Sequence, residues 1–303
     1  MSLGSEPDWV KGALQLRPQV ARPRAGGPEG DDSPFTLTSF GEEDFFELAY
    51  GDGARFFVDR DAKLLWGTCL APLTLEDLGT YLLGPVLGFV LRRRGAIALH
   101  ASSVCLSGQA VVLCGPSESG KSTTAAALAL RGIPVIAEDI SPLSERDAWL
   151  HVEPGYPRIC LWPDTVKCLF DAADALPPLT PTWEKCFLAL DGVSARFEPL
   201  ARPLGAIYLL SPRVDETNAP RIEDLGGRNA LLELVQNTYM NWLLDRRQRA
   251  AELDVLSKLV TQVPVRRIVP PSDPARLWAL CDLILKDAER QLGRQALAAG
   301  SGR

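Results

Sequence analysis

Residues 110–139 of the chain read AVVLCGPSESGKSTTAAALALRGIPVIAED. The apolar run 110–114 is typical of a buried strand, and a second such run follows at 134–137. Between them, residues 115–122 fit the pattern G-x-x-x-x-G-K-[ST] of a phosphate-binding loop, and residues 123–131 have the composition of a helix. The order strand, loop, helix, strand predicts an α/β core that binds a nucleoside triphosphate.

The chemistry of such a loop comes from backbone N–H groups that converge on a phosphate at the positive end of the following helix. We expect Lys121 to neutralise oxygens of the β- and γ-phosphates and Ser122 to place its hydroxyl on Mg²⁺. The expected ligands are therefore ATP, or another nucleoside triphosphate, and Mg²⁺. The predicted nucleotide contacts are Gly115, Pro116, Ser117, Glu118, Ser119, Gly120, Lys121, Ser122 and Thr123.

Glu118 stands where many loops of this kind carry glycine. A carboxylate that pointed into the loop would repel a triphosphate, so we expect this side chain to face solvent. The α-subunits of GTP-binding G proteins have a similar Glu-Ser-Gly-Lys-Ser stretch, which indicates that glutamate at this position is compatible with nucleotide binding.

Two carboxylates, Glu138 and Asp139, follow the second strand directly. Ligands of α/β folds bind at the carboxyl ends of the strands, so one carboxylate can hold Mg²⁺ while the other accepts a proton from an attacking hydroxyl. An acidic turn or a helix cap is the alternative. The short distance from the loop, and the lack of a Leu-Ser-Gly-Gly-Gln signature, favour a kinase over a transporter-type ATPase.

His100 ends an apolar run upstream of the loop, and taken alone it is typical of a satisfied core histidine. Its segment, Leu-His-Ala-Ser at 99–102, precedes the phosphate loop, the Leu-Arg-Gly at 130–132 and the Ala-Glu-Asp at 137–139. This series of segments, at these separations, resembles the catalytic core of the HPr kinase/phosphorylase family.

The resemblance implies a PEP-carboxykinase-like P-loop fold and a set of roles in it. His100 and Glu138 would form the acid/base group that assists an attacking serine hydroxyl. Asp139 would bind Mg²⁺, and Lys121 and Ser122 would contact the phosphates and the metal. Glu138 stands where the family usually has aspartate, so this base would reach about one methylene further.

Residues 154–164 and the C-terminal helical region are similar to HPr-kinase-related proteins of peptide-modification clusters. Some of these, the lasso-peptide kinases, phosphorylate a serine of a precursor peptide. The chain has no Glu-x-Arg-Gly-Leu-Gly segment, which the bifunctional enzymes use for metal binding and for the reverse reaction. The resemblance therefore favours a peptide or small protein other than HPr as the acceptor, without phosphorylase activity.

Arg158 is a candidate contact for the transferring phosphate or for an anionic substrate, and Trp162 is a candidate for the lining of a peptide groove. The alternative is a proline-braced loop that packs Trp162 into the core. The sequence leaves both interpretations open.

Three functions remain open at this stage. The first is a kinase that acts on serine or threonine in a peptide or small protein. The second is a small-molecule hydroxyl kinase, since shikimate-kinase-like enzymes have acidic residues at a similar distance from the loop but no upstream histidine hairpin. The third is a non-catalytic ATP-binding module for sensing or assembly, in which Glu138 marks lost chemistry.

Composition narrows the range of partners. A net charge of −6 without a long Lys/Arg run disfavours nucleic-acid binding through phosphate neutralisation. Seven scattered cysteines with no CxxC pair, and only two histidines, disfavour zinc and disulfides. No apolar stretch is long enough to span a bilayer and no signal-peptide core is evident, so we expect a cytoplasmic protein without a membrane partner. Whether the chain forms a homo-oligomer is left open.

Four regions are predicted along the chain. Residues 1–33 are rich in Pro, Gly and charged residues and are expected to be flexible. Residues 34–95 should form a small antiparallel β-element plus a helix, residues 96–294 the HPr-kinase-like domain, and residues 295–303 a disordered tail.

Helix caps, apolar runs and proline-rich stretches predict individual helices, strands and irregular segments. Thr74 can cap a helix that ends in three arginines at 92–94, although these arginines could instead form a substrate-binding patch. Two short β-runs, 96–100 and 103–106, are expected before the loop strand. The chain from 142 to 181 is predicted to be irregular, and residues of about 227–260 to be one long helical region before a last strand and helix.

Overall fold

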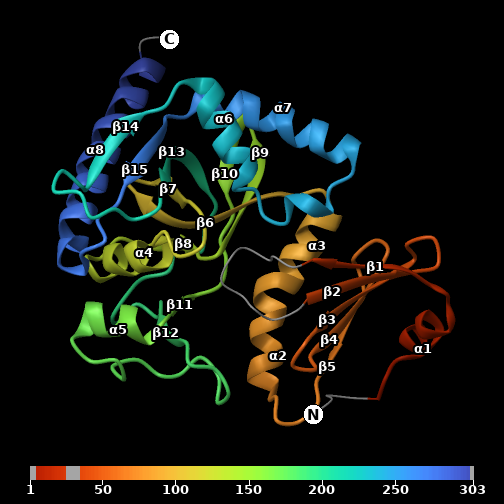
Figure 1. Ribbon diagram of the computed structural model, residues 1–303. Coiled ribbons are helices and arrows are strands. Elements are labelled where there is room, and N and C mark those ends of the chain that lie inside the picture. The colour runs from red at the N-terminus through yellow and green to blue at the C-terminus, as the bar shows by residue number, and fades with distance from the viewer. Residues whose placement is uncertain (1–4, 25–34, 301–303) are drawn as a thin grey trace. The chain divides into compact units, whose positions relative to one another are not determined.

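The computed structural model describes residues 5–24 and 35–300, which form two compact units (Figure 1). The first unit runs to Gly95 and includes residues 178–184, and the second holds residues 96–177 and those from 185 onward. One division between the units thus falls after Gly95. Residues 178–184 were assigned to the second unit by sequence and lie instead in the first, because Thr182 Oγ1 donates a hydrogen bond to Asp77 (2.5 Å).

The first unit contains a five-stranded antiparallel sheet whose strands follow one another in chain order. Two features differ from the expected flexible segment 1–33: helix α1 (Asp8–Gln15), whose Trp9 stacks on Phe45, and strand β1. Residues 1–4 and 25–34 lie outside the described part of the chain. The strands are β1 (Pro18–Arg24), β2 (Phe35–Phe40), β3 (Phe45–Tyr50), β4 (Arg55–Asp59) and β5 (Leu65–Thr68).

A helical segment packs on this sheet, and it contains α2 (Leu75–Tyr81), the π-turn η1 (Leu82–Val86) and α3 (Leu87–Arg93). The predicted cap is confirmed, since the Thr74 hydroxyl accepts a hydrogen bond from the Asp77 N–H and the Asp77 carboxylate accepts one from the Thr74 N–H. Pro85 lies inside η1, where its missing N–H accounts for the widened turn. The ring of Phe89 packs edge to face against the ring of Phe46 in β3, with the ring centroids 5.4 Å apart.

The second unit is a mixed α/β fold around an eight-stranded sheet of order β10-β9-β6-β7-β13-β15-β14, with β8 paired to β6. β7 is parallel to β13, and β13 is parallel to β15, whereas β6 is antiparallel to both β7 and β8. The strands are β6 (Ile97–Leu106), β7 (Gln109–Cys114), β8 (Val135–Ala137), β9 (Ile140–Arg146), β10 (Trp149–Val152), β13 (Arg202–Leu210), β14 (Arg221–Asp224) and β15 (Val265–Val269).

Helices cover both faces of this sheet (Figure 1). Alternate residues of β7 divide between the two faces: Val111 and Leu113 join the core with α4 (Lys121–Leu130) and α8 (Leu277–Gly300). Val112 and Cys114 join the core with α6 (Gly227–Gln236) and α7 (Arg246–Gln262). A strand buried on both faces explains why residues 110–114 are continuously apolar. The predicted strand, loop, helix, strand order is confirmed.

Several local predictions were wrong. The two β-runs before the loop strand are one continuous strand, β6. The stretch expected to be irregular holds β9, β10, β11 (Arg158–Leu161) and α5 (Pro163–Phe170), and β11 pairs with β12 (Cys186–Ala189). Proline-rich sequence concealed these elements: Pro142 lies inside β9, Pro163 is the first residue of α5, and Pro154 and Pro157 lie between β10 and β11.

The long C-terminal helical region is also interrupted. Between α6 and α7 lie residues 237–245, with the short helix η2 (Asn241–Leu243) and a left-handed Met240 (φ +46°). The break occurs because Asn237 and Tyr239 use their backbone groups to bond strand β6. The last helix, α8, follows the short turn η3 (Pro274–Arg276) and continues to Gly300, where a disordered tail from residue 295 was expected. None of the described helices is long and apolar enough to cross a bilayer.

Candidate functional site

Sheet topology gathers the three predicted catalytic segments at one edge. Because β6 is antiparallel to both β7 and β8, those two strands run in the same direction and end on the same side. The register places Ala101 opposite Cys114 and Ser103 opposite Ala137, so His100 lies level with the end of β7. The structure therefore brings the phosphate loop, His100 and the acidic pair after β8 together.

The glycines of the phosphate loop are required by its backbone. Gly115 (φ +155°) and Gly120 (φ +99°) both have positive φ angles. A side-chain carbon at Gly115 would lie 2.7 Å from the Leu210 carbonyl oxygen, and one at Gly120 would lie 3.1 Å from Arg213 Nη2. Glycine alone fits both conformation and space, as a loop that cradles phosphate needs. Glu118 is exposed, as predicted.

Lys121, the first residue of α4, is 7% exposed. Its ammonium donates to the carbonyl oxygens of Gly115 and Pro116, each at 2.9 Å, and is thus held against the loop. Burial lowers the pKa of Lys121, and the charge of Asp139 counteracts this shift. A desolvated cation at this place is suited to bind the oxygens of a phosphate chain.

The acidic residues contact different partners from those that the resemblance implies. Ser122 Oγ donates to Glu138 Oε1 at 2.7 Å, whereas His100 Nε2 lies 3.3 Å from Asp139 Oδ1. The residue predicted to share the metal with Ser122 was Asp139, and the partner predicted for His100 was Glu138. The contacts without ligand are thus exchanged relative to those roles, and the backbone explains the exchange: Asp139 has a left-handed backbone (φ +66°), which turns consecutive side chains toward different neighbours.

The two carboxylates also differ electrostatically. Glu138 is 7% exposed, and burial, with the adjacent charge of Asp139, raises its pKa to about 7. Burial acts in the same direction on Asp139, but the hydrogen bond and charge of His100, with the charges of Lys185 and Lys121, outweigh it and lower its pKa. Asp139 is therefore the carboxylate that is ionised and hydrogen-bonded to a histidine.

The segment between α6 and α7 holds His100 in place. The backbone N–H of His100 donates to the Asn237 carbonyl at 2.8 Å, and Tyr239 donates in return to the Ala98 carbonyl at 2.8 Å. The Tyr239 ring meets the His100 ring edge to face, with centroids 6.0 Å apart. No motif in the sequence indicates this support, because the residues lie about 140 positions away from His100.

Lys185 is a second residue that sequence reasoning missed. Its charge lowers the pKa of both Glu138 and Asp139, so it lies near the acidic pair. Its ammonium also lies 4.6 Å from the centre of the Trp162 ring. Trp162 is 50% exposed, so the alternative in which it packs into the core was wrong.

Arg158, the candidate substrate contact, has two buried nitrogens, Nε and Nη2, that lack a hydrogen-bond partner among the described residues. Its guanidinium lies 5.0 Å from the centre of the Tyr156 ring. A side-chain carbon at Gly155, three residues before Arg158, would lie 3.8 Å from the Glu138 backbone nitrogen, so the segment that leads to Arg158 passes beside the acidic pair. A buried cation with free donors is suited to receive an anionic group.

The donor set fits Mg²⁺ bound together with a nucleotide. The described residues contain no group of three or more His, Cys, Asp or Glu arranged to hold a metal on their own. Mg²⁺ is usually held by one or two carboxylates plus substrate phosphates. Ser122 and Glu138, already 2.7 Å apart, are a hydroxyl and a carboxylate of the kind this requires.

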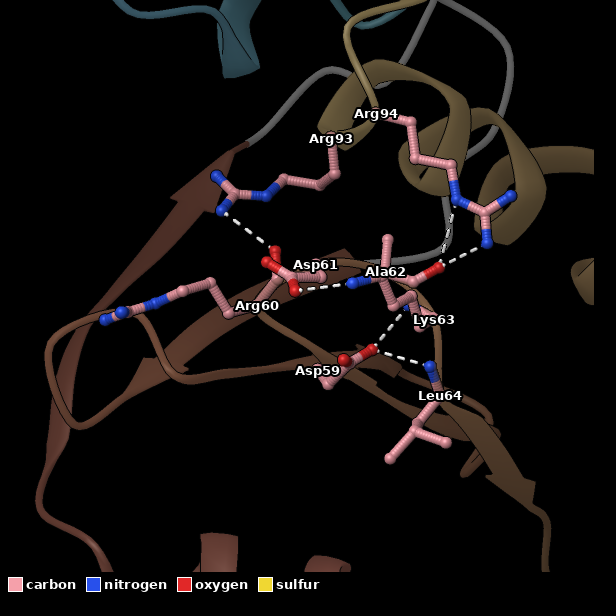
Figure 2. Close-up of polar contacts among 8 residues, drawn as sticks. All are labelled: Asp59, Arg60, Asp61, Ala62, Lys63, Leu64, Arg93 and Arg94. Atoms are coloured by element: carbon pink, nitrogen blue, oxygen red, sulfur yellow. Dashed lines mark hydrogen bonds and ion pairs between the residues drawn. The ribbon is translucent and has the colours of Figure 1, made fainter.

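The three arginines at the end of α3 belong to the first unit and bind within it (Figure 2). Arg94 donates twice to the Ala62 carbonyl, at 3.1 and 2.6 Å, and Arg93 donates to the Arg60 carbonyl at 3.4 Å. Arg92 is 2% exposed. These contacts secure the turn between β4 and β5, which favours the helix-stop interpretation over a substrate-binding patch.

Comparison with known proteins finds similarity among solved structures. No protein-family model matches the chain, and no curated protein matches it. Among solved structures, the chain is similar to the HPr(Ser) kinase/phosphatase from Coxiella burnetii, with 15% sequence identity and a TM-score of 0.36. The match covers 67% of this chain and 96% of that one. A similarity at this level assigns no roles to residues of this chain.

Proposed function

We propose that the chain is an ATP-dependent kinase that transfers the γ-phosphoryl group to a serine or threonine hydroxyl of a peptide or small protein. The observation that carries this proposal is the pair of contacts at the loop, Ser122 with Glu138 and His100 with Asp139. A phosphoryl transferase needs positioned charge for the phosphates and a group that orients the attacking hydroxyl. The PEP-carboxykinase-like form of the P-loop fold is part of the proposal.

The contacts support the following division of roles. Asp139 accepts the proton of the attacking hydroxyl, and His100, 3.3 Å away, orients its carboxylate. Glu138 and Ser122 would hold Mg²⁺, which when bound neutralises charge on the phosphates. Lys121 binds phosphate oxygens from the loop side. This assignment exchanges the two acidic residues relative to the family resemblance.

The acceptor is proposed to bind beside the acidic pair, where Trp162 exposes half of its surface next to the Lys185 ammonium. An exposed aromatic ring with a cation over it can bind an extended chain, whereas a small metabolite is usually enclosed. This observation favours a peptide or small protein over the alternative of a small-molecule hydroxyl kinase. Arg158, with its free donors, would bind an anionic group of the acceptor or the transferring phosphate.

The non-catalytic ATP-binding module remains the other alternative. Glu138 in place of aspartate was the sequence feature that motivated it. The contact of Ser122 with Glu138 supports a metal-binding role for the glutamate, in which a longer side chain is compatible with catalysis.

The test is transfer of labelled γ-phosphate from ATP or GTP in Mg²⁺ to serine-containing peptides, including peptides encoded beside the gene. We expect label on serine or threonine, and loss of both nucleotide binding and transfer in Lys121→Ala. Lys258→Ala is the matched control, because Lys258 is an exposed lysine paired with Asp254 on α7. It should retain both activities.

Label on a metabolite alone would instead assign a small-molecule kinase. Tight ATP binding without any transfer would assign the non-catalytic module. Unchanged nucleotide binding in Lys121→Ala would reject the loop as the nucleotide site.

A further inference from the structure

A pocket lies beside the start of α4. It is lined by loop and helix residues, by α5 and by the segments after β13 and β15, and it includes Thr123, Thr165, Arg213, Pro271, Ser272 and Leu280. Its volume of about 140 Å³ far exceeds the roughly 10–15 Å³ that admits one water, so an organic group fits.

Sheet topology explains why the pocket forms there. β7, β13 and β15 are neighbouring parallel strands, so the segments that follow them emerge at one edge. These segments are the phosphate loop, the turn with Arg213, and residues 270–274. Ligands of open α/β sheets bind at this edge, and the pocket is the hollow between the three segments.

The pocket lies on a different side of α4 from the acidic residues. Successive residues of a helix point about 100° apart, so Ser122 and Thr123 face different directions. Ser122 faces Glu138, whereas the Thr123 hydroxyl lies 3.4 Å from that of Thr165 at the pocket wall. If the γ-phosphate is directed to the acidic pair, the opposite end of a nucleotide on the loop is directed to the pocket.

Two polar groups at the pocket have no partner among the residues that the structure describes. Ser119 is 2% exposed, and its Oγ has no hydrogen-bond partner among the described residues. Arg213 lines the pocket with its guanidinium against Gly120, 3.1 Å from where a side-chain carbon there would lie. In the described part of the chain we find no ion pair for Arg213. Buried hydroxyls are normally hydrogen-bonded, so the free Ser119 group indicates a missing ligand.

We propose that this pocket receives the nucleoside end of the triphosphate and that Arg213 binds its α-phosphate. The proposal rests on the nucleotide site proposed above and extends it to the donor's base and ribose. Proline and leucine side chains supply apolar surface for a base, and serine and threonine hydroxyls supply partners for a ribose. Arg213 supplies a charge-assisted contact to a phosphate that leaves the loop toward the pocket.

The test compares the affinities of ATP and inorganic tripolyphosphate, both with Mg²⁺, by calorimetry. Wild-type protein should bind ATP at least about tenfold more tightly, since one added apolar or polar contact contributes about that factor. Ser272→Trp fills the pocket and should remove that advantage while leaving tripolyphosphate affinity unchanged. Ser257→Trp, at a half-buried position of α7 that does not line the pocket, is the matched control and should bind both ligands like the wild type.

Arg213→Ala should weaken both ligands about tenfold or more, because both place a phosphate at that position, and Arg213→Lys should restore part of the loss. If the wild type binds ATP and tripolyphosphate with equal affinity, and Ser272→Trp does not change the affinity for ATP, the pocket does not bind the nucleoside. That result would leave the proposed phosphate site intact. Binding of neither ligand would reject the nucleotide site itself. Comparison of ATP with GTP, CTP and UTP then identifies the preferred base.

Discussion

The first and second units each bury a carboxylate, Asp77 and Glu138, but they surround it differently. Asp77, at 0% exposure, accepts hydrogen bonds from the Thr74 N–H and hydroxyl and from the Thr182 hydroxyl. Burial acts to raise its pKa, and hydrogen bonds from Thr180, Thr182 and Thr74 outweigh it and lower the pKa. Glu138 accepts a hydrogen bond from the Ser122 hydroxyl, and burial with the neighbouring Asp139 raises its pKa.

This difference in surroundings distinguishes a carboxylate that stabilises the fold from one that is suited to bind a ligand. A buried charge that is fully hydrogen-bonded orders its surroundings, as Asp77 does at the start of α2. A buried carboxylate with few donors and a like charge beside it destabilises the protein without a ligand. Groups of this second kind are concentrated at functional sites. The comparison therefore predicts that removing the charge of Asp77 lowers the stability of the ligand-free protein, whereas removing the charge of Glu138 raises it.

The largest effect is expected at Asp139. Asp139→Asn removes the proposed proton acceptor, so kcat should fall by about 10²–10⁴-fold, the usual contribution of general-base catalysis. The affinity for ATP should stay within a few fold, because Lys121 and the loop are unchanged. Rates from steady-state transfer and affinities from calorimetry measure the two effects separately.

Asp254→Asn is the control for this substitution, since Asp254 is an exposed aspartate of α7 that pairs with Lys258. It should leave kcat unchanged. Loss of transfer in Glu138→Gln together with normal transfer in Asp139→Asn would return the acid/base role to Glu138 and the metal role to Asp139.

The next largest effect is expected at Asp77. Asp77→Ala removes the acceptor for donors of Thr74, Thr180 and Thr182 and one half of a capping box, so the free energy of unfolding should fall by about 2–4 kcal/mol. Urea denaturation measures the loss, and hydrogen exchange of the α2 amides should locate it in the first unit. An unchanged unfolding midpoint would show that the hydroxyls around Asp77 find other partners.

The pH dependence of stability tests whether the charge of the Asp77 carboxylate causes the loss in Asp77→Ala. A carboxyl group with a lowered pKa in the folded protein stabilises it above its unfolded pKa, about 3.8, and this contribution is lost as the pH falls through the lower, folded value. The stability difference between wild type and Asp77→Ala should therefore be constant between about pH 5 and 7. It should shrink below about pH 4.

The sequence predicted the part of the fold and site that depends on local pattern. The phosphate loop and the strand before it follow from glycine spacing and an apolar run, and Thr74 from cap chemistry. The boundary after Gly95 follows from a helix stop. Predictions were wrong where distant residues decide the backbone, as at Asn237, whose carbonyl bonds His100 in β6 and interrupts an otherwise helical pattern.

The proximity of the candidate residues could be predicted from the sequence, but the contacts between their side chains could not. Proximity of His100, Glu138 and Asp139 to the loop follows from their positions at strand ends. Which carboxylate meets His100 depends on the left-handed backbone of Asp139, which no sequence pattern indicates. Lys185 and Arg213 come from separate parts of the chain and lack any motif, so only the fold reveals their place.

The smallest effect is expected at Glu138, where substitution should raise the stability of the ligand-free protein, whereas substitution of Asp77 lowers it. Glu138→Gln keeps an oxygen to accept from Ser122 but removes the charge beside Asp139, so the ligand-free protein should gain about 1 kcal/mol in stability. For a unit of this size such a gain raises Tm by about 2–4 °C. Saturating Mg²⁺ and ATP should reverse the order, because a ligand stabilises the protein that binds it more tightly. A loss of stability without ligand, like that of Asp77→Ala, would show that Glu138 is a structural carboxylate and that the two units do not differ in this respect.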